Sequence, residues 1–97
     1  MIENTNDRLM RIEEVLKETS IKKTNLYELI KTFKRALNEE TDELKYNELN
    51  SIYILIKPKK FGRTSLWSYN QIQQLIVYIK DGYIEEVLDY MKYKNVA

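Results

Sequence analysis

The sequence predicts a small α+β domain, mostly helical, with the architecture of a winged helix-turn-helix. Apolar residues recur at helical spacing on both sides of a short polar turn, a β-branched segment then runs into the single proline, and two more helical patterns follow. The 97 residues are 43% apolar and 32% charged, which is typical of a globular chain with one modest core. One domain spanning residues 1–97 is therefore expected.

Residues 11–37 have the pattern of two helices joined by a tight turn. The apolar positions at helical spacing are Ile12, Val15, Leu16, Leu26, Leu29, Ile30, Phe33 and Leu37. Asn25 and Glu28 have the spacing of a capping box, which satisfies backbone N–H groups at the start of a helix. The second helix is therefore predicted to begin near Thr24 and to end near Leu37.

The polar side chains of this second helix suit contacts with DNA. At about 100° per residue, Thr24, Tyr27, Lys31 and Arg35 fall on one face, with Lys34 at its edge. Such side chains contact phosphates and base edges. The candidate DNA-binding residues of this region are Lys22, Lys23, Thr24, Asn25, Tyr27, Lys31, Lys34 and Arg35. The pattern predicts a recognition helix for the major groove.

Residues 51–67 are predicted to form a β-hairpin that serves as a wing. Residues 51–57 are β-branched and aromatic, which favours a strand, and Pro58 ends it because proline cannot donate to a sheet ladder. Residues 59–62 are expected to make the turn, and residues 63–67 the returning strand.

The predicted wing carries four cations. Lys59 and Lys60 are expected at its tip, and Lys57 and Arg63 at its base, where all four can contact the DNA backbone. Two aromatic residues, Phe61 and Trp67, could stack on unpaired bases. Trp67 could instead fill the core and close the wing onto the helices.

Charge is segregated along the chain, although the net charge is only +1. Residues 22–35 and 57–63 are basic, whereas acidic residues gather at Glu39, Glu40, Asp42, Glu43 and Glu48 and again at Asp81, Glu85, Glu86 and Asp89. Such segregation produces a local positive surface on a nearly neutral protein. The alternative for each basic cluster alone is a solvated lysine face.

Two further regions complete the predicted domain. Residues 38–50 form an acidic insertion, expected to be a loop or a short helix that faces away from DNA. Residues 69–93 are expected to form two C-terminal helices, the first beginning at Ser68 or Tyr69. Their tyrosines, which can bind a partner or simply cap the core, are Tyr78, Tyr83, Tyr90 and Tyr93. The partner could be a second copy of the chain or another protein.

Two segments carry a family resemblance. The segment RLMRIEEVLKETSIKKTNLYELIK, residues 8–31, resembles the opening of AlpA-type regulators and excisionases, which share a MerR-like winged helix-turn-helix. FGRTSLW, residues 61–67, resembles the wing of that family. Ser20 stands where the family usually has glycine, so a left-handed turn there costs about 1 kcal/mol more than with glycine.

The resemblance implies a DNA-binding protein of a phage, plasmid or other mobile element, acting as a transcriptional regulator or an excisionase-like architectural factor. A recombinase is one protein partner of that kind. Double-stranded DNA is the favoured ligand. The alternative function is an accessory subunit of a mobile-element DNA polymerase or primase, which would bind single-stranded DNA and a protein partner. A third is an adaptor or inhibitor that binds no nucleic acid.

Composition argues against several other classes. The chain has no histidine and no cysteine, so it lacks the commonest general base, metal ligand and nucleophile. We therefore expect no enzymatic activity, no cofactor and no metal. The sequence has no apolar run long enough to span a bilayer and no signal-peptide pattern at its start, so a cytoplasmic location without membrane contact is expected.

Overall fold

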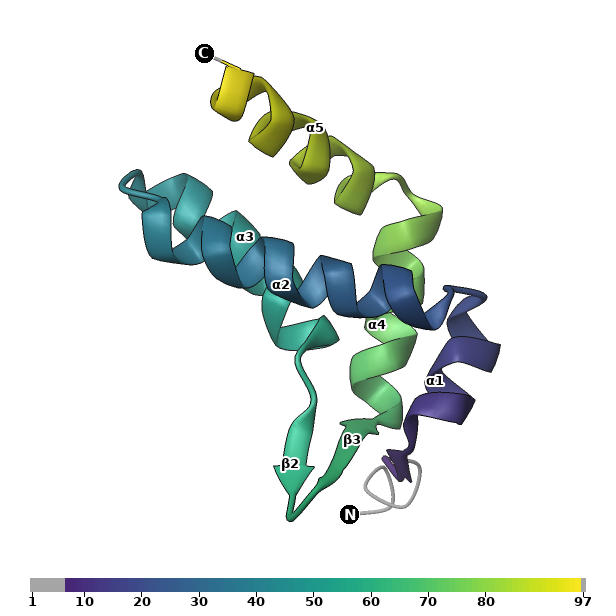
Figure 1. The fold of residues 1–97 in the computed structure, drawn as a ribbon. Helices are drawn as coiled ribbons and strands as arrows, with labels where there is room; N and C mark the ends of the chain where they lie inside the picture. Colours follow the sequence, from purple (N-terminus) through teal and green to yellow (C-terminus); the bar gives the residue numbers. More distant parts are fainter. Residues whose placement is uncertain (1–6, 97) are drawn as a thin grey trace.

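A computed structural model describes residues 7–96, with side chains through Tyr93. Within them the chain forms a small compact α+β domain of five helices and a three-stranded antiparallel sheet, mostly helical as the sequence predicts (Figure 1). The elements are β1 (Leu9–Met10), α1 (Ile12–Thr19), α2 (Lys23–Glu39), α3 (Glu43–Ile56), β2 (Lys59–Phe61), β3 (Thr64–Ser68), α4 (Tyr69–Lys80) and α5 (Tyr83–Val96).

The helices enclose one core, and the β2–β3 hairpin extends away from it. Figure 1 shows α2 lying across the molecule against α3, with α4 crossing behind it and α5 on the side opposite the hairpin. The ten largest fully buried side chains are Trp67, Phe33, Met10, Leu26, Leu49, Ile52, Ile56, Ile72, Leu75 and Val15. Every described helix except α5 contributes to this set, so the core joins the α1–α2 pair to the base of the hairpin.

The turn between α1 and α2 takes three residues. Ser20 adopts the left-handed conformation, with φ 61° and ψ 20°, and its N–H donates to the carbonyl of Leu16. The Thr19 hydroxyl accepts a hydrogen bond from the N–H of Ile21 at 3.2 Å. Helices at residues 12–19 and 23–39 thus confirm the predicted pair, and the left-handed Ser20 falls where the family resemblance places a glycine.

The predicted capping box at Asn25 and Glu28 is wrong. Helix α2 begins at Lys23, after the extended Lys22, so Asn25 already lies inside its first turn. The reason is that the left-handed Ser20 and the extended Lys22 reverse the chain within three residues. A reciprocal box of this kind forms instead at Ser68 and Gln71, where α4 begins.

The strand predicted at residues 51–57 is also wrong, because those residues complete helix α3. The side chain of Asp42 accepts a hydrogen bond from the N–H of Leu44 and caps a helix that continues to Ile56. Leu49, Ile52 and Ile56 are buried on one face, which is helical spacing. The segment predicted as an acidic insertion, residues 38–50, therefore holds the end of α2, a short connection and the first half of α3.

The hairpin is shorter than predicted, and its turn is shifted. Strand β2 pairs with β3 in the register Lys59↔Leu66, Lys60↔Ser65 and Phe61↔Thr64. Gly62 and Arg63 make the turn, and the positive φ of Gly62, 65°, suits the first turn position of a type II′ hairpin. Arg63 thus lies at the tip, whereas the expectation had Lys59 and Lys60 there.

A third strand was not expected from the sequence. Strand β1 pairs with β3 on the side opposite β2, with Leu9 facing Ser68 and Met10 facing Trp67. A segment of two residues is too short to show an alternating pattern. Because Met10 is fully buried, this strand fastens the chain before α1 to the base of the hairpin.

The two C-terminal helices agree with the prediction. Helix α4 begins after Ser68 and ends before Asp81 and Gly82, and Gly82 has a φ of 79°. Helix α5 buries Ile84, Val87 and Met91. None of the helices within residues 7–96 combines the length and the apolarity needed to cross a membrane.

Candidate nucleic-acid interface

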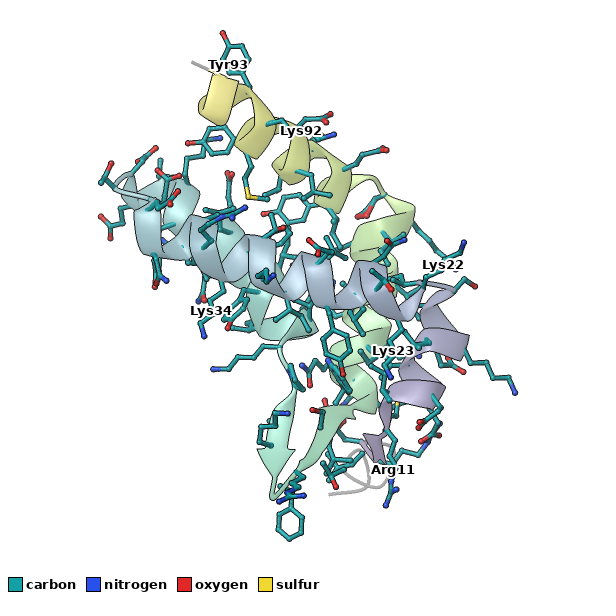
Figure 2. The ribbon with its side chains drawn as sticks, in the orientation of Figure 1. Arg11, Lys22, Lys23, Lys34, Lys92 and Tyr93 are labelled. Carbon is teal, nitrogen blue, oxygen red and sulfur yellow. The ribbon has the colours of Figure 1, made fainter. Side chains whose placement is uncertain are left out.

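The exposed face of α2 that lies toward the hairpin is basic. Lys23, Tyr27, Lys31 and Lys34 are all exposed, and at 100° per residue they fall within an arc of about 80°. Figure 2 shows Lys23 and Lys34 on the side of α2 where the hairpin lies. We call these four residues the α2 basic face.

The structure connects this face to the hairpin. An open hollow is lined by Tyr27 of α2, by Arg11, Ile12 and Glu13 at the start of α1, and by Arg63, Thr64 and Ser65 of the hairpin. Tyr27 is 44% exposed, so part of its side chain is open to solvent beside this hollow. Residues that are far apart in the sequence therefore form one continuous surface.

Arg11 is a cation of this surface that the sequence pattern did not single out. It is exposed at the N-terminus of α1, and Figure 2 places it beside the hairpin. No local signal distinguishes Arg11 from other surface arginines. It joins the surface because β1 pairs with β3 and so carries the start of α1 to the hairpin.

The hairpin contributes its own cations. Lys57, Lys59, Lys60 and Arg63 are all exposed. The ammonium nitrogen of Lys57 lies 5.7 Å from the centre of the Tyr53 ring, and that of Lys60 donates to the hydroxyl of Ser65 at 2.9 Å. Both contacts leave N–H groups of the ammonium for an anion, because each lysine has three.

Glu13 is a carboxylate in the lining of the hollow, but in the described part of the chain no ion pair joins a carboxylate to a cation of the α2 basic face or of the hairpin. Within the described residues, the two ion pairs shorter than 4 Å join Arg8 to Glu14 at 2.8 Å and Lys45 to Glu48 at 3.5 Å. Neither includes a cation of the α2 basic face or of the hairpin. The positive charge there is thus available to an external anion.

The Arg8–Glu14 pair orders the edge of the surface. Hydrogen bonds from the Arg8 guanidinium and then from the backbone N–H of Arg11 lower the pKa of Glu14 below its ordinary value. The guanidinium carbon of Arg8 also lies 5.2 Å from the centre of the Tyr69 ring. These contacts tie the N-terminus of α1 to the N-terminus of α4, next to Arg11.

Four predicted residues of the helix-turn region lie apart from the centre of the α2 basic face. Thr24 is on the exposed side of α2, about 60° from Tyr27, but Asn25 is about 160° away. Arg35 lines a separate hollow with Glu39, Glu40 and residues of α5. Lys22 lies at the outer end of the turn before α2 (Figure 2).

The two aromatic residues of the hairpin have opposite environments. Trp67 is fully buried, and its indole N–H donates to the carbonyl of Ile56 at 2.7 Å. The core interpretation of Trp67 is therefore confirmed, and base stacking by its ring is excluded by burial. Phe61, next to the turn, is 79% exposed.

Gln71 fixes the base of the hairpin. Its side-chain oxygen accepts from the N–H of Ser68 at 3.0 Å, and its amide nitrogen donates to the carbonyls of Ile54, Leu55 and Lys57 at 3.1, 3.0 and 2.8 Å. One side chain thus caps the beginning of α4 and the end of α3. Since β2 follows α3 and β3 precedes α4, both arms of the hairpin leave from this clamp.

Three of the four tyrosines assigned to partner binding make contacts within the chain. The rings of Tyr78 and Tyr83 meet edge to face with centres 4.9 Å apart. The Tyr90 hydroxyl donates to a carboxylate oxygen of Glu40 at 3.3 Å. Tyr93 is 77% exposed and lies near the free end of α5 (Figure 2). The exposed aromatic surface of this region is therefore concentrated at Tyr93.

The described residues contain no group of three or more histidine, cysteine, aspartate or glutamate side chains that could hold a metal ion. The geometry that they do provide is an open basic surface formed by a helix and a hairpin. Comparison with protein-family models, with curated proteins and with solved structures finds no match to this chain.

Proposed function

We propose that this chain is a noncatalytic DNA-binding protein built as a winged helix-turn-helix. Helix α2 is the recognition helix, which enters the major groove with Lys23, Tyr27, Lys31 and Lys34. The β2–β3 hairpin is the wing. In this role the protein acts as a transcriptional regulator or an excisionase-like architectural factor of a mobile element, in line with the resemblance of residues 8–31 and 61–67.

The observation that carries the proposal is the shared hollow between α2 and the hairpin. Tyr27 and Arg63 line it together, although they are separated by the whole of α3 in the sequence. Cations on both elements therefore lie on one side of the molecule and can contact one duplex at the same time. Phosphate contacts by such cations supply essentially all of the affinity for non-specific DNA.

The proposal is tested by fluorescence anisotropy with a labelled mixed-sequence duplex over a salt series. The double variant Lys59→Ala/Lys60→Ala should bind more weakly, and its slope of log affinity against log salt should be smaller by roughly 1 for each lysine lost. Lys80→Ala/Lys92→Ala is the matched control, because it removes the same charge from exposed positions outside the proposed interface. That control should keep the slope of the wild type.

A second pair of variants tests which residues of α2 contact the bases, as measured by the preference for one duplex sequence over others. Tyr27→Ala should reduce the preference for one selected duplex over others, because Tyr27 lies at the centre of the α2 basic face. Asn25→Ala should change this preference less, since Asn25 lies about 160° away from Tyr27 around the helix. Equal binding by wild type and the Lys59→Ala/Lys60→Ala variant would overturn the assignment of the wing.

One observation favours the accessory-subunit alternative. The exposed Phe61 beside Lys59 and Lys60 could stack on the bases of a single strand. The same anisotropy series with one strand of the duplex discriminates the two functions, because the accessory subunit binds the single strand more tightly. Failure to bind either form at low salt would favour the protein adaptor.

A further inference from the structure

Phe61 lies at the tip of the hairpin with most of its ring in solvent. It is 79% exposed, the largest value among the exposed large apolar residues of the described chain. Its cross-strand partner is the small Thr64, and the turn Gly62–Arg63 follows it directly. The ring therefore contributes little to the core. Its position at the far end of the hairpin makes it available for contact with a molecule that binds there.

The cations around Phe61 point to both sides of the hairpin. Successive residues of a strand face opposite sides, so Lys59 shares the face of Phe61 whereas Lys60 lies on the other face with Ser65. Arg63 is in the turn itself. An apolar tip is thus flanked by positive charge on each face of a two-stranded ribbon.

This arrangement matches a minor groove better than a single strand. The minor groove is only about 6 Å wide and has a phosphate backbone on each side. The tip of a ribbon that lies over it can therefore contact one backbone from each face, while a single side chain enters the groove. A single strand offers one backbone, and one of the two faces would then remain unpaired. Apolar side chains inserted from the minor groove unstack a base step and bend the duplex.

We infer that Phe61 is an apolar wedge that enters between two adjacent base pairs from the minor groove and bends the duplex. This inference rests on the proposed DNA-binding function. Lys59 and Lys60 hold the two backbones, and Phe61 fills the gap opened at the base step. The DNA favoured by the hairpin therefore contains an easily unstacked pyrimidine–purine step such as TA.

The test uses a mixed-sequence duplex with a central TA step, a fluorophore pair at its ends and 2-aminopurine at the step. Binding of the wild type should raise both the energy transfer between the ends and the 2-aminopurine fluorescence. Phe61→Ala should abolish both signals and weaken binding by roughly tenfold, as expected for the loss of one stacked ring. Its salt slope should stay that of the wild type, because no cation is removed.

Two variants keep the inference falsifiable. Phe61→Leu retains a branched apolar wedge and should keep most of the bending, whereas Tyr93→Ala removes an equally exposed ring outside the interface and should keep all of it. Equal bending by the wild type and Phe61→Ala, or duplex binding without bending, would overturn the wedge while leaving the proposed DNA binding intact. Absence of any anisotropy change with the duplex would overturn both.

Discussion

Single side chains fix the backbone at the points where the chain changes direction. Ser20 takes a left-handed conformation to end α1, and Gln71 satisfies backbone groups of two helices at once. A substitution at Ser20 can relieve backbone strain, and a substitution at Gln71 can remove stabilising hydrogen bonds. Ser20 is strained because a Cβ atom is disfavoured at positive φ. The side-chain oxygen of Gln71 accepts one hydrogen bond, and its two amide N–H groups are shared among three nearby carbonyls.

Ser20→Gly should raise the free energy of unfolding by up to about 1 kcal/mol, because it removes the strain of the left-handed conformation. The gain is limited by the greater freedom of glycine in the unfolded chain. Chemical denaturation followed by circular dichroism measures it. Gly82→Ala is the reverse control: a Cβ atom there meets nothing within 4 Å, so its loss of stability reflects the positive φ alone. A lower stability of Ser20→Gly would contradict the strain argument.

Gln71→Glu should lower the free energy of unfolding by about 1 to 3 kcal/mol at neutral pH. The variant keeps an acceptor for the N–H of Ser68 but turns a carboxylate toward the carbonyls at the end of α3, where the helix dipole is also negative. Gln71→Ala removes the same bonds without adding a charge and should cost less.

The sign of the pH dependence separates these two effects. Surrounding carbonyls raise the pKa of the new carboxyl in the folded state, so the protonated form is favoured there and can donate. Denaturation at several pH values should show the penalty of Gln71→Glu shrinking as the pH falls toward about 4. A pH-independent penalty would show that the carboxyl does not face the carbonyls.

The elements differ in how well the sequence predicts them. Apolar spacing predicts α1, α2, α4 and α5, but the second half of α3 has the composition of a strand. Ile52 and Ile56 are β-branched, and that preference hid their helical spacing to Leu49. Tertiary packing of this spaced triad against α2 and the core overrides the local β preference.

The sequence predicts most of the cations that belong to the candidate site, but it does not predict how the fold groups them. Charge clustering in the sequence identifies the lysines of α2 and of the hairpin, because the exposure of a lysine can be expected without knowledge of the fold. Helical periodicity already separates Asn25 from Tyr27 by about 160°, because both lie inside α2. The grouping of the hairpin cations depends on the turn position, which places Arg63 at the tip. Arg11 joins the surface only through strand pairing, which two residues cannot reveal.

Trp67→Phe should lower the free energy of unfolding by roughly 2 kcal/mol, since it leaves the carbonyl of Ile56 without the indole N–H and the core with a smaller ring. Urea denaturation followed by circular dichroism measures the loss. Phe61→Ala on the same hairpin should change stability by less than about 0.5 kcal/mol, because its ring is exposed. Similar losses in both variants would contradict the assignment of Trp67 as the anchor between α3 and the hairpin.

At the scale of the whole molecule, the net charge is small, but the positive and negative residues are unevenly distributed over the surface. Sixteen basic and fifteen acidic residues nearly cancel, yet the acids Glu39 and Glu43 lie where α2 turns into α3, away from the hairpin (Figure 1). The molecule therefore presents a positive side within a nearly neutral total. An asymmetric field of this kind attracts a polyanion to the positive side and is strongly weakened by salt.

Glu39→Gln/Glu43→Gln should strengthen duplex binding severalfold at low salt, because it removes negative charge at one end of α2 without touching the proposed interface. The gain should vanish near 1 M salt, where the screening length falls to about 3 Å. Anisotropy titrations at both salt concentrations measure it. Glu39→Asp/Glu43→Asp preserves the charge and should bind like the wild type. A gain that persists at high salt would indicate a direct contact instead of a long-range field.

The clamp formed by Gln71 and the buried Trp67 has a consequence for how this protein can diversify. Both arms of the hairpin are fastened at their base, and residues 58–66 lie beyond those fastenings with none of them fully buried. The hairpin therefore tolerates sequence change. Its length, its tip and its cations can vary while the core that supports α2 keeps its packing. Substitutions in this segment can therefore change the exposed surface of the hairpin at little cost to folding.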